Sequence, residues 1–147
     1  MKIRKAVAED LHQMSVLLQH LNPADPILPA DNLHIAWSKI LNSELIHCLV
    51  AESACQLAAT CTLVIVPNLS RSARSFGLIE NVVTHEQFRR QGIGTALMKS
   101  ALELAWSQGC YKMTLTTGSQ KEQTLRFYER LGFVQGTKIA FVARPSD

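Results

Sequence analysis

The chain has 147 residues and a formal net charge of +3, with 47% hydrophobic and 18% charged residues. Charged residues are rarer than the average of about 25% in soluble domains, and this composition excludes an intrinsically disordered chain. No basic run is longer than Arg89-Arg90, so there is no basic stripe that would favour nucleic-acid binding. We therefore expect one folded domain over residues 1–147 with a substantial core.

The ends of the chain and its cysteines narrow the class of protein further. The basic segment Met1 to Lys5 leads into Glu9-Asp10 without a long apolar segment, so no secretory signal is expected. No apolar run approaches the roughly 18 residues that a membrane span needs. The four cysteines form no C-x-x-C pair and no cluster with metal-ligand spacing. We expect free thiols, no metal, no membrane contact and a cytoplasmic location.

In the first half of the chain, the patterns predict one strand, then two helices, then two further strands. Leu11, Met14 and Leu18 recur at helical spacing after Glu9-Asp10, and a loop rich in proline follows. The expected elements are a strand over 2–5, a helix that opens at Glu9-Asp10, a helix over 31–42, and strands over 47–52 and 56–66 joined as a hairpin.

The second half of the chain carries the clearest helix. Residues 92–108 are apolar almost all round, as in a helix that packs on more than one side, and Gly109 suits the position just past its end. The expected elements are a polar loop over 70–75, a strand over 76–83, this helix, a strand over 111–117, a helix over 121–131, and last strands at 133–134 and 137–143. This order predicts a mixed α/β domain.

The loop from Arg89 to Thr95 has the character of a phosphate site. Glycines let the backbone approach an anion, and the first N–H groups of a helix carry a partial positive charge. A dinucleotide fingerprint fails because its third glycine position is Leu97, and no Walker loop is present. Arg89, Gly92 and Gly94 satisfy R-x-x-G-x-G, which fits a pyrophosphate cradle. Glycines that only permit a tight turn are the alternative.

Four blocks of sequence occur at linked spacing: Ile79–Val83, Arg89–Gly94, Gly109–Lys112 and Arg126–Phe133. Together they resemble the GNAT superfamily of acetyl-CoA-dependent N-acetyltransferases. The resemblance implies a mixed, mostly antiparallel central sheet of about six to seven strands that splays after the fourth strand and is flanked by about four helices.

The resemblance also implies how acetyl-CoA is bound. Its pantetheine arm is expected to pair with the backbone of Val82, Val83 and Thr84. Its pyrophosphate is expected to lie in the loop of Arg89 on the amides of Arg90, Gln91, Gly92, Ile93, Gly94 and Thr95. Relatives often carry Asn and Ala ahead of the tyrosine, where this chain has Lys121 and Thr124, so a contact made by that Asn is not carried over.

Acetyl transfer to an amine requires few side chains. The acceptor arrives as an ammonium with a pKa of about 10.4 and must lose a proton. Glu80 is the candidate base, directly or through water, and Leu78 and Val82 are expected to flank it on one strand face and bury it in part. The resemblance places the backbone N–H of Val83 at the oxyanion and Tyr128 as the acid for the leaving thiolate. The alternatives are a strand carboxylate paired with an arginine and a tyrosine packed under its helix.

These residues predict an N-acetyltransferase that moves an acetyl group from acetyl-CoA to the primary amine of a small molecule in a direct ternary complex. The Ile79–Val83 and Gly109–Lys112 blocks resemble those of relatives that acetylate amino sugar phosphates or aminophosphonates. Arg71 and Arg74 are either contacts to a phosphate or carboxylate of the acceptor or residues of a solvated loop. A protein or peptide amine is one alternative, and a non-catalytic acyl-CoA-binding sensor is another. The low charge content is compatible with a homodimer.

Overall fold

A computed structural model describes residues 1–145, and the last two residues of the expected domain lie outside it. The chain divides into two compact units, residues 1–115 and residues 116–147, which are described separately. The expectation of a single domain stays a prediction.

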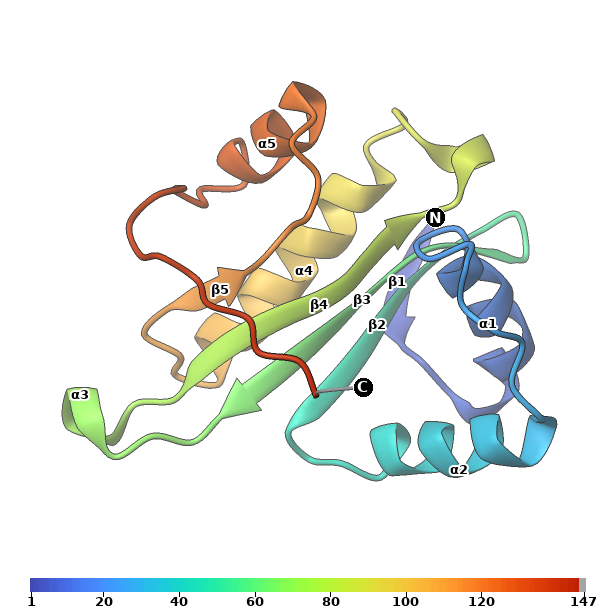
Figure 1. The fold of residues 1–147 in the computed structure, drawn as a ribbon, viewed down its shortest axis with the longest axis horizontal. Coiled ribbons are helices and arrows are strands. Elements are labelled where there is room, and N and C mark those ends of the chain that lie inside the picture. The colour runs from blue at the N-terminus through green and yellow to red at the C-terminus, as the bar shows by residue number, and fades with distance from the viewer. Residues whose placement is uncertain (146–147) are drawn as a thin grey trace. The chain divides into compact units, whose positions relative to one another are not determined.

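The first unit is a five-stranded sheet with helices, shown in Figure 1. Its strands lie in the order β1-β2-β3-β4-β5, and every pair is antiparallel except β4 with β5. The elements are β1 (Lys2–Lys5), η1 (Ala8–Asp10), α1 (Leu11–Gln19), α2 (Ala30–Leu41), β2 (Ile46–Ser53), β3 (Gln56–Val66), α3 (Ser70–Ala73), β4 (Phe76–Thr84), η2 (Glu86–Phe88), α4 (Ile93–Ser107) and β5 (Met113–Leu115). The mixed, mostly antiparallel sheet is confirmed.

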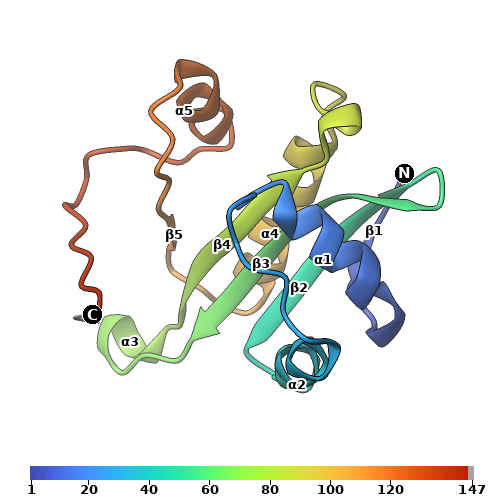
Figure 2. The ribbon, with the colours of Figure 1, turned by 45° about the vertical axis from the view of Figure 1, so that its right-hand side comes forward.

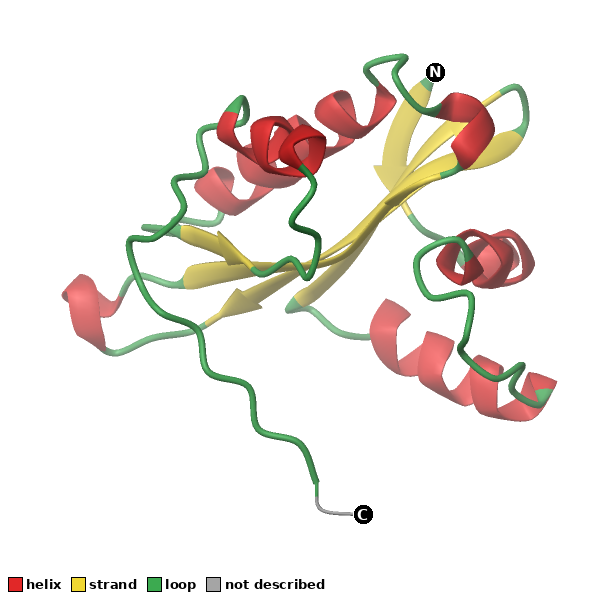
Figure 3. Ribbon diagram, turned by 45° about the horizontal axis from the view of Figure 1, so that its top comes forward, coloured by secondary structure: helices red, strands yellow, loops and turns green. Residues whose placement is uncertain are grey.

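Helices cover both faces of this sheet: α1 and α2 lie on one face and α4 on the other (Figures 1 and 3). Strands buried on both faces read as continuous apolar runs, and β2 and β3 have that character. Side chains alternate between the two faces, so Cys48 and Val50 point toward α1 and α2, whereas Leu49 and Ala51 point toward α4.

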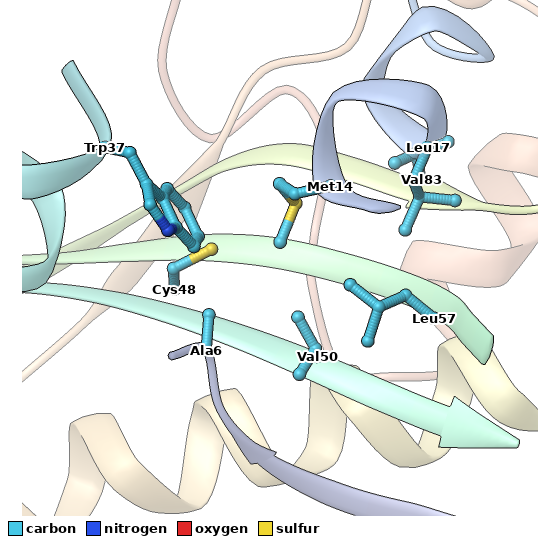
Figure 4. Close-up of a cluster of buried hydrophobic side chains, with 8 residues drawn as sticks. All are labelled: Ala6, Met14, Leu17, Trp37, Cys48, Val50, Leu57 and Val83. Carbon is cyan, nitrogen blue, oxygen red and sulfur yellow. The ribbon is translucent and has the colours of Figure 1, made fainter. Parts of the chain in front are cut away.

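The core under α1 and α2 also fixes one end of β4. The cluster drawn in Figure 4 consists of Ala6, Met14, Leu17, Trp37, Cys48, Val50, Leu57 and Val83. Trp37 comes from α2 and donates its indole N–H to the carbonyl of Ala8 at 3.3 Å. Burying one such apolar side chain is worth about 1.5–3 kcal/mol. Val83 is therefore a well-anchored point near the end of β4.

The second unit contains α5 (Glu122–Glu129), which ends in a left-handed turn at Gly132 with φ 91°. Gly132 N donates to the carbonyl of Glu129 at 2.9 Å, and Phe133 N donates to that of Tyr128 at 3.2 Å. This is the pattern of a glycine C-cap, in which the residue after the glycine packs against the last turn of the helix.

The strands expected at 133–134 and 137–143 are wrong: no strand follows β5 in the described residues. Figure 2 shows this segment as an extended chain with no strand arrow. Its apolar side chains are exposed, with Phe141 at 92% and Ile139 at 83%. A strand needs a neighbouring strand to pair its backbone groups, and an apolar composition cannot supply one. The described sheet consequently has five strands instead of about six to seven.

Two expected elements differ locally from the structure. The expected loop over 70–75 contains the short turn α3, and the strand expected over 111–117 is only Met113–Leu115. All four cysteines are free thiols. Among residues 1–145, no helix has the length and apolar character to cross a membrane.

Candidate active site

The sheet opens beside β4. This strand pairs with β3 along most of its length but with β5 only from Gly77 to Ile79. Beyond Ile79, no strand of the described first unit lies against that edge of β4. The edge from Glu80 to Thr84 is therefore free, as the expected splaying of the sheet requires.

A β-bulge interrupts β4 next to the candidate base. Thr62 pairs with Glu80 and Thr60 pairs with Val83, so two residues of β4 lie opposite the single residue Cys61 of β3. The first of the two, Asn81, has φ 52°. Asparagine is among the few non-glycine residues that adopt this left-handed conformation readily. Residue 81 therefore has a conformational role that its place in a strand pattern did not reveal.

The bulge changes which side chains share a face with Glu80. Glu80 lies in register with Thr62, and both lie on the face of Cys48, which is also the face that buries Val83. Leu78 shares this face, as expected, but Val82 points to the other side because the extra residue inverts the alternation. The Glu80 side chain is exposed instead of partly buried.

Backbone alternation also decides which groups of β4 reach the free edge. His85 N donates to the carbonyl of Ala58 in β3 at 2.8 Å. Val83, two residues earlier, therefore directs its own N–H toward β3 as well. The oxyanion role expected for the Val83 N–H does not fit this direction. The N–H of Thr84 and the carbonyl of Val82 point the other way, to the free edge.

The hydrogen bonds at the start of β4 show which backbone groups of the bulge face the free edge. Gly77 N donates to the carbonyl of Lys112 beside β5 at 3.0 Å, so Gly77 and Ile79 direct their backbone groups toward β5 and Glu80 directs its groups toward β3. The carbonyl of Glu80 points to β3, and the N–H of Asn81, on the opposite side of the same peptide unit, points to the free edge.

The loop after β4 presents a row of backbone N–H groups. Arg90 has φ 58° and Gly92 has φ 76°, and α4 begins at Ile93. The first helical bond of α4 runs from Ala96 N to the carbonyl of Gly92 at 3.0 Å. Within residues 1–145, no hydrogen bond uses the N–H groups of residues 90–95. Such a concave set of amides at a helix N-terminus binds anions, and no acidic residue lies in the first turn of α4.

Side chains of the same loop hold it against the end of β4. Arg89 Nε donates to the carbonyl of Thr84 at 3.1 Å, and Gln91 Nε2 donates to that of Gln87 at 3.0 Å. His85 Nδ1 accepts a hydrogen bond from Gln87 N at 3.3 Å. Arg89 and Arg90 are exposed and supply positive charge beside the free amides. The residues expected to hold pyrophosphate thus form one continuous segment.

Tyr128 belongs to the second unit and lies near the C-terminal end of α5. Its ring makes edge-to-face contacts with Phe127 at 5.0 Å and Phe133 at 6.1 Å between centroids. Lys121 is the exposed N-cap residue of α5, and Thr124 is bonded to Ser119 through their hydroxyls at 3.2 Å. The positions that depart from the family pattern therefore have local roles at the start of this helix.

The arginines of the loop before β4 differ from each other. Arg74 Nε donates to the carbonyl of Gly109 at 3.4 Å, and its terminal nitrogen donates to that of Cys110 at 3.3 Å. This side chain joins the loop to the chain after α4. Arg71 has φ 56° in the turn and is exposed. Within residues 1–145, no group of three or more His, Cys, Asp or Glu side chains has an arrangement that could hold a metal ion.

Comparison with known proteins identifies the family. The model of the acetyltransferase (GNAT) family matches residues 11–133. The chain is 31% identical to the glucosamine 6-phosphate N-acetyltransferase of Trypanosoma brucei brucei over 90% of this chain and 88% of that protein. It is 28% identical to glucosamine 6-phosphate N-acetyltransferase 1 of Oryza sativa subsp. japonica over 81% and 72% of the two chains. The solved structure of a protein described as an acetyltransferase, from Agrobacterium tumefaciens str. C58, has a TM-score of 0.94 and 39% identity over 99% of this chain and 100% of that one. This chain belongs to the acetyltransferase (GNAT) family and is an acetyltransferase enzyme.

Proposed function

We propose that the enzyme transfers an acetyl group from acetyl-CoA, the donor of its family, to the primary amine of an amino sugar phosphate such as glucosamine 6-phosphate. The observation that carries the donor is the free edge of β4, which leads directly into the unbonded amides of residues 90–95. The acceptor is supported by the two relatives named for glucosamine 6-phosphate, which align over 90% and 81% of this chain.

The free edge and the loop fit the two polar parts of the donor. The pantetheine arm carries amide groups, and these pair with the N–H of Thr84 and the carbonyl of Val82 as a neighbouring strand would. The pyrophosphate lies on the amides of residues 90–95 at the start of α4. A hydrogen bond to a charged group is worth about 1.5–3 kcal/mol, so a few of these amides supply most of the affinity for the diphosphate.

Glu80 takes the first proton in the reaction. The acceptor ammonium gives one proton to the Glu80 carboxylate, directly or through one water, and the freed lone pair attacks the thioester carbon. The oxyanion that forms needs an N–H donor, and we place this donor in the bulge, at the N–H of Asn81 or its neighbour Val82.

The collapse of this intermediate returns the remaining protons. The carbon–sulfur bond breaks, the thiolate takes up one proton, and the nitrogen of the former ammonium loses its second proton. Tyr128 is the acid that the family resemblance proposes for this transfer. Glu80 gives its proton to solvent, so the products are an N-acetyl amide, free coenzyme A and one proton. Holding the two substrates together is worth up to about 7–11 kcal/mol in ideal cases, which makes a covalent acetyl-enzyme unnecessary.

The test is the release of coenzyme A thiol from acetyl-CoA with a panel of amines. The panel holds glucosamine 6-phosphate, glucosamine, an aminophosphonate and a peptide with a free N-terminus. We expect kcat/KM for the sugar phosphate to exceed that for glucosamine at least about tenfold, because one charge-assisted contact to the phosphate is worth that factor. Release with the peptide alone would favour a protein acceptor. Acetyl-CoA binding without release with any amine would favour a sensor.

Glu80→Gln tests the base. An amide cannot accept the ammonium proton, so we expect turnover near neutral pH to fall about 10²–10⁴-fold and to recover at alkaline pH, where hydroxide deprotonates the amine unaided. Glu86→Gln is the matched control, because Glu86 is an exposed acid just past the end of β4. A pH–rate profile of Glu80→Gln that equals the wild type would remove Glu80 from this role.

A further inference from the structure

A row of polar side chains crosses three strands on the face that carries Glu80. Cys48 of β2 lies in register with Thr62 of β3, and Thr62 lies in register with Glu80 of β4. Directly opposed residues on one face have Cβ atoms about 4.5–5.5 Å apart. The side chain of Thr62 is therefore the immediate cross-strand neighbour of the candidate base.

This polar row lies beside an apolar part of the same sheet face. Part of the same face is covered by the apolar cluster of Figure 4, which includes Cys48 and Val83. Exposure rises along the row, from the buried Cys48 through the half-buried Thr62 to the exposed Glu80. The polar side chain of Thr62 is thus in part accessible to solvent on the side where the Glu80 carboxylate lies.

The two threonines of β3 on this face are not equivalent. Thr60 is 1% exposed, and its hydroxyl donates to the carbonyl of Leu49 at 2.9 Å, so its hydrogen is used inside the core. The thiol of Cys48 lies 3.7 Å from the Thr60 oxygen, and Thr62 is the residue directly opposite Cys48 in the strand register. Burial keeps the pKa of the Cys48 thiol above its ordinary value, so Cys48 stays a neutral neighbour.

We infer that Thr62 is a positioning residue for Glu80, whose hydroxyl orients the water that carries the proton from the acceptor ammonium to the carboxylate. This inference rests on the proposed function. The water needs a lone pair directed at the ammonium, and it has two hydrogens to place. One hydrogen is donated to Glu80 and the other to Thr62 Oγ1, while the Thr62 hydroxyl hydrogen points to the Cys48 sulfur.

The proton balance of this step is simple. The ammonium loses one proton to the water, and the water gives one of its own protons to the Glu80 carboxylate. The water is unchanged, the amine becomes neutral, and Glu80 becomes a carboxylic acid. A carboxylate alone fixes only one of the two hydrogens, so without Thr62 the water rotates and the lone pair is not held toward the amine.

Thr62→Val is the test, because valine keeps the shape and removes the hydroxyl. We expect kcat near neutral pH to fall about tenfold, the loss of roughly one hydrogen bond, with the KM for acetyl-CoA unchanged. We expect the acidic limb of the pH–rate profile to move to higher pH, and Thr62→Ser to restore it. Thr60→Val is the matched control: it should lower the melting temperature and leave the pH profile where it is.

A double variant decides whether Thr62 acts through Glu80. In the Glu80→Gln background, Thr62→Val should cost no further activity, because the route it serves is already lost. Full additivity of the two losses would overturn the inference, and so would a wild-type pH profile in Thr62→Val. If the wild type is active and Glu80→Gln loses activity but Thr62→Val does not, only this inference is refuted. An inactive wild type refutes the proposed function and the inference with it.

Discussion

The bulge at Asn81 allows the sharpest test of how the fold makes the site. Residue 81 must adopt φ 52°, which costs a residue with a Cβ about 1–2 kcal/mol and costs a β-branched residue most. Asn81→Val should therefore lower the free energy of unfolding by at least about 1–2 kcal/mol. For a chain of about this length, 1 kcal/mol shifts the melting temperature by about 2–4 °C, so we expect a decrease of about 2–8 °C.

The effect on catalysis should be larger than the effect on stability. If β4 of Asn81→Val keeps its bulge, the backbone around residue 81 shifts to relieve the strain and displaces Glu80. If it loses the bulge, Glu80 and Val83 fall on opposite faces, because a one-residue change of register inverts the alternation. A displacement of about 1 Å near reacting groups costs on the order of 10²-fold, which is the loss of kcat we expect in either case.

Asn81→Gly is the matched variant, because glycine adopts a positive φ without steric cost. It loses about 0.4–1 kcal/mol through the greater freedom of the unfolded chain, offset by the relief of the asparagine's own strain. We expect nearly wild-type unfolding and kcat. Thermal unfolding by circular dichroism and thiol release measure the two quantities. Wild-type stability and kcat in Asn81→Val would refute the reasoning from the bulge.

Two further predictions concern the loop and the core. Gly94→Glu should abolish the binding of acetyl-CoA, measured by calorimetry, because it places a negative side chain against the diphosphate. Gly118→Glu adds the same charge in an exposed loop with open space and should bind acetyl-CoA normally. Normal affinity in Gly94→Glu would count against the pyrophosphate cradle. Burial, together with the nearby Lys5, lowers the pKa of the His47 imidazole below its ordinary 6.5. The imidazole therefore binds a proton more readily in the unfolded chain than in the folded one. The free energy of unfolding should fall as the pH drops from about 6.5 through the folded-state pKa. Urea unfolding at several pH values should show this slope in the wild type and a shallower one in His47→Gln; equal slopes would contradict it.

Many elements and the glycine loop after β4 were predictable because their signals are local. The long apolar run of β3 and the helical period of α4 each depend on residues close together in the chain, and both elements occur where the pattern placed them. The glycines after β4 are also a local signal, because a positive φ at Gly92 and free amides at a helix start are properties of one short segment. The role of these amides in binding stays a prediction.

The details of the site depended on pairing between distant residues. The sequence around Glu80 reads as a regular strand, and only the register against β3 shows the extra residue that turns Val82 away and directs the Val83 N–H into the sheet. The asparagine at position 81 is the one local signal of the bulge, and an asparagine can also stand in a regular strand with its side chain in solvent. Nothing in the sequence distinguishes Thr62 from the other threonines, because the role inferred for it depends on its register with Glu80 across the sheet.

The sequence by itself determined that this chain forms a mixed sheet with helices and that it carries the acetyltransferase pattern, since periodicity and short motifs are written in neighbouring residues. Only the tertiary structure decided where the sheet ends: the largely apolar residues 137–143 have a strand's composition, yet they lie outside the described sheet with exposed side chains. The physical reason is that a strand exists only when another backbone accepts and donates its hydrogen bonds, and that choice is made across the fold.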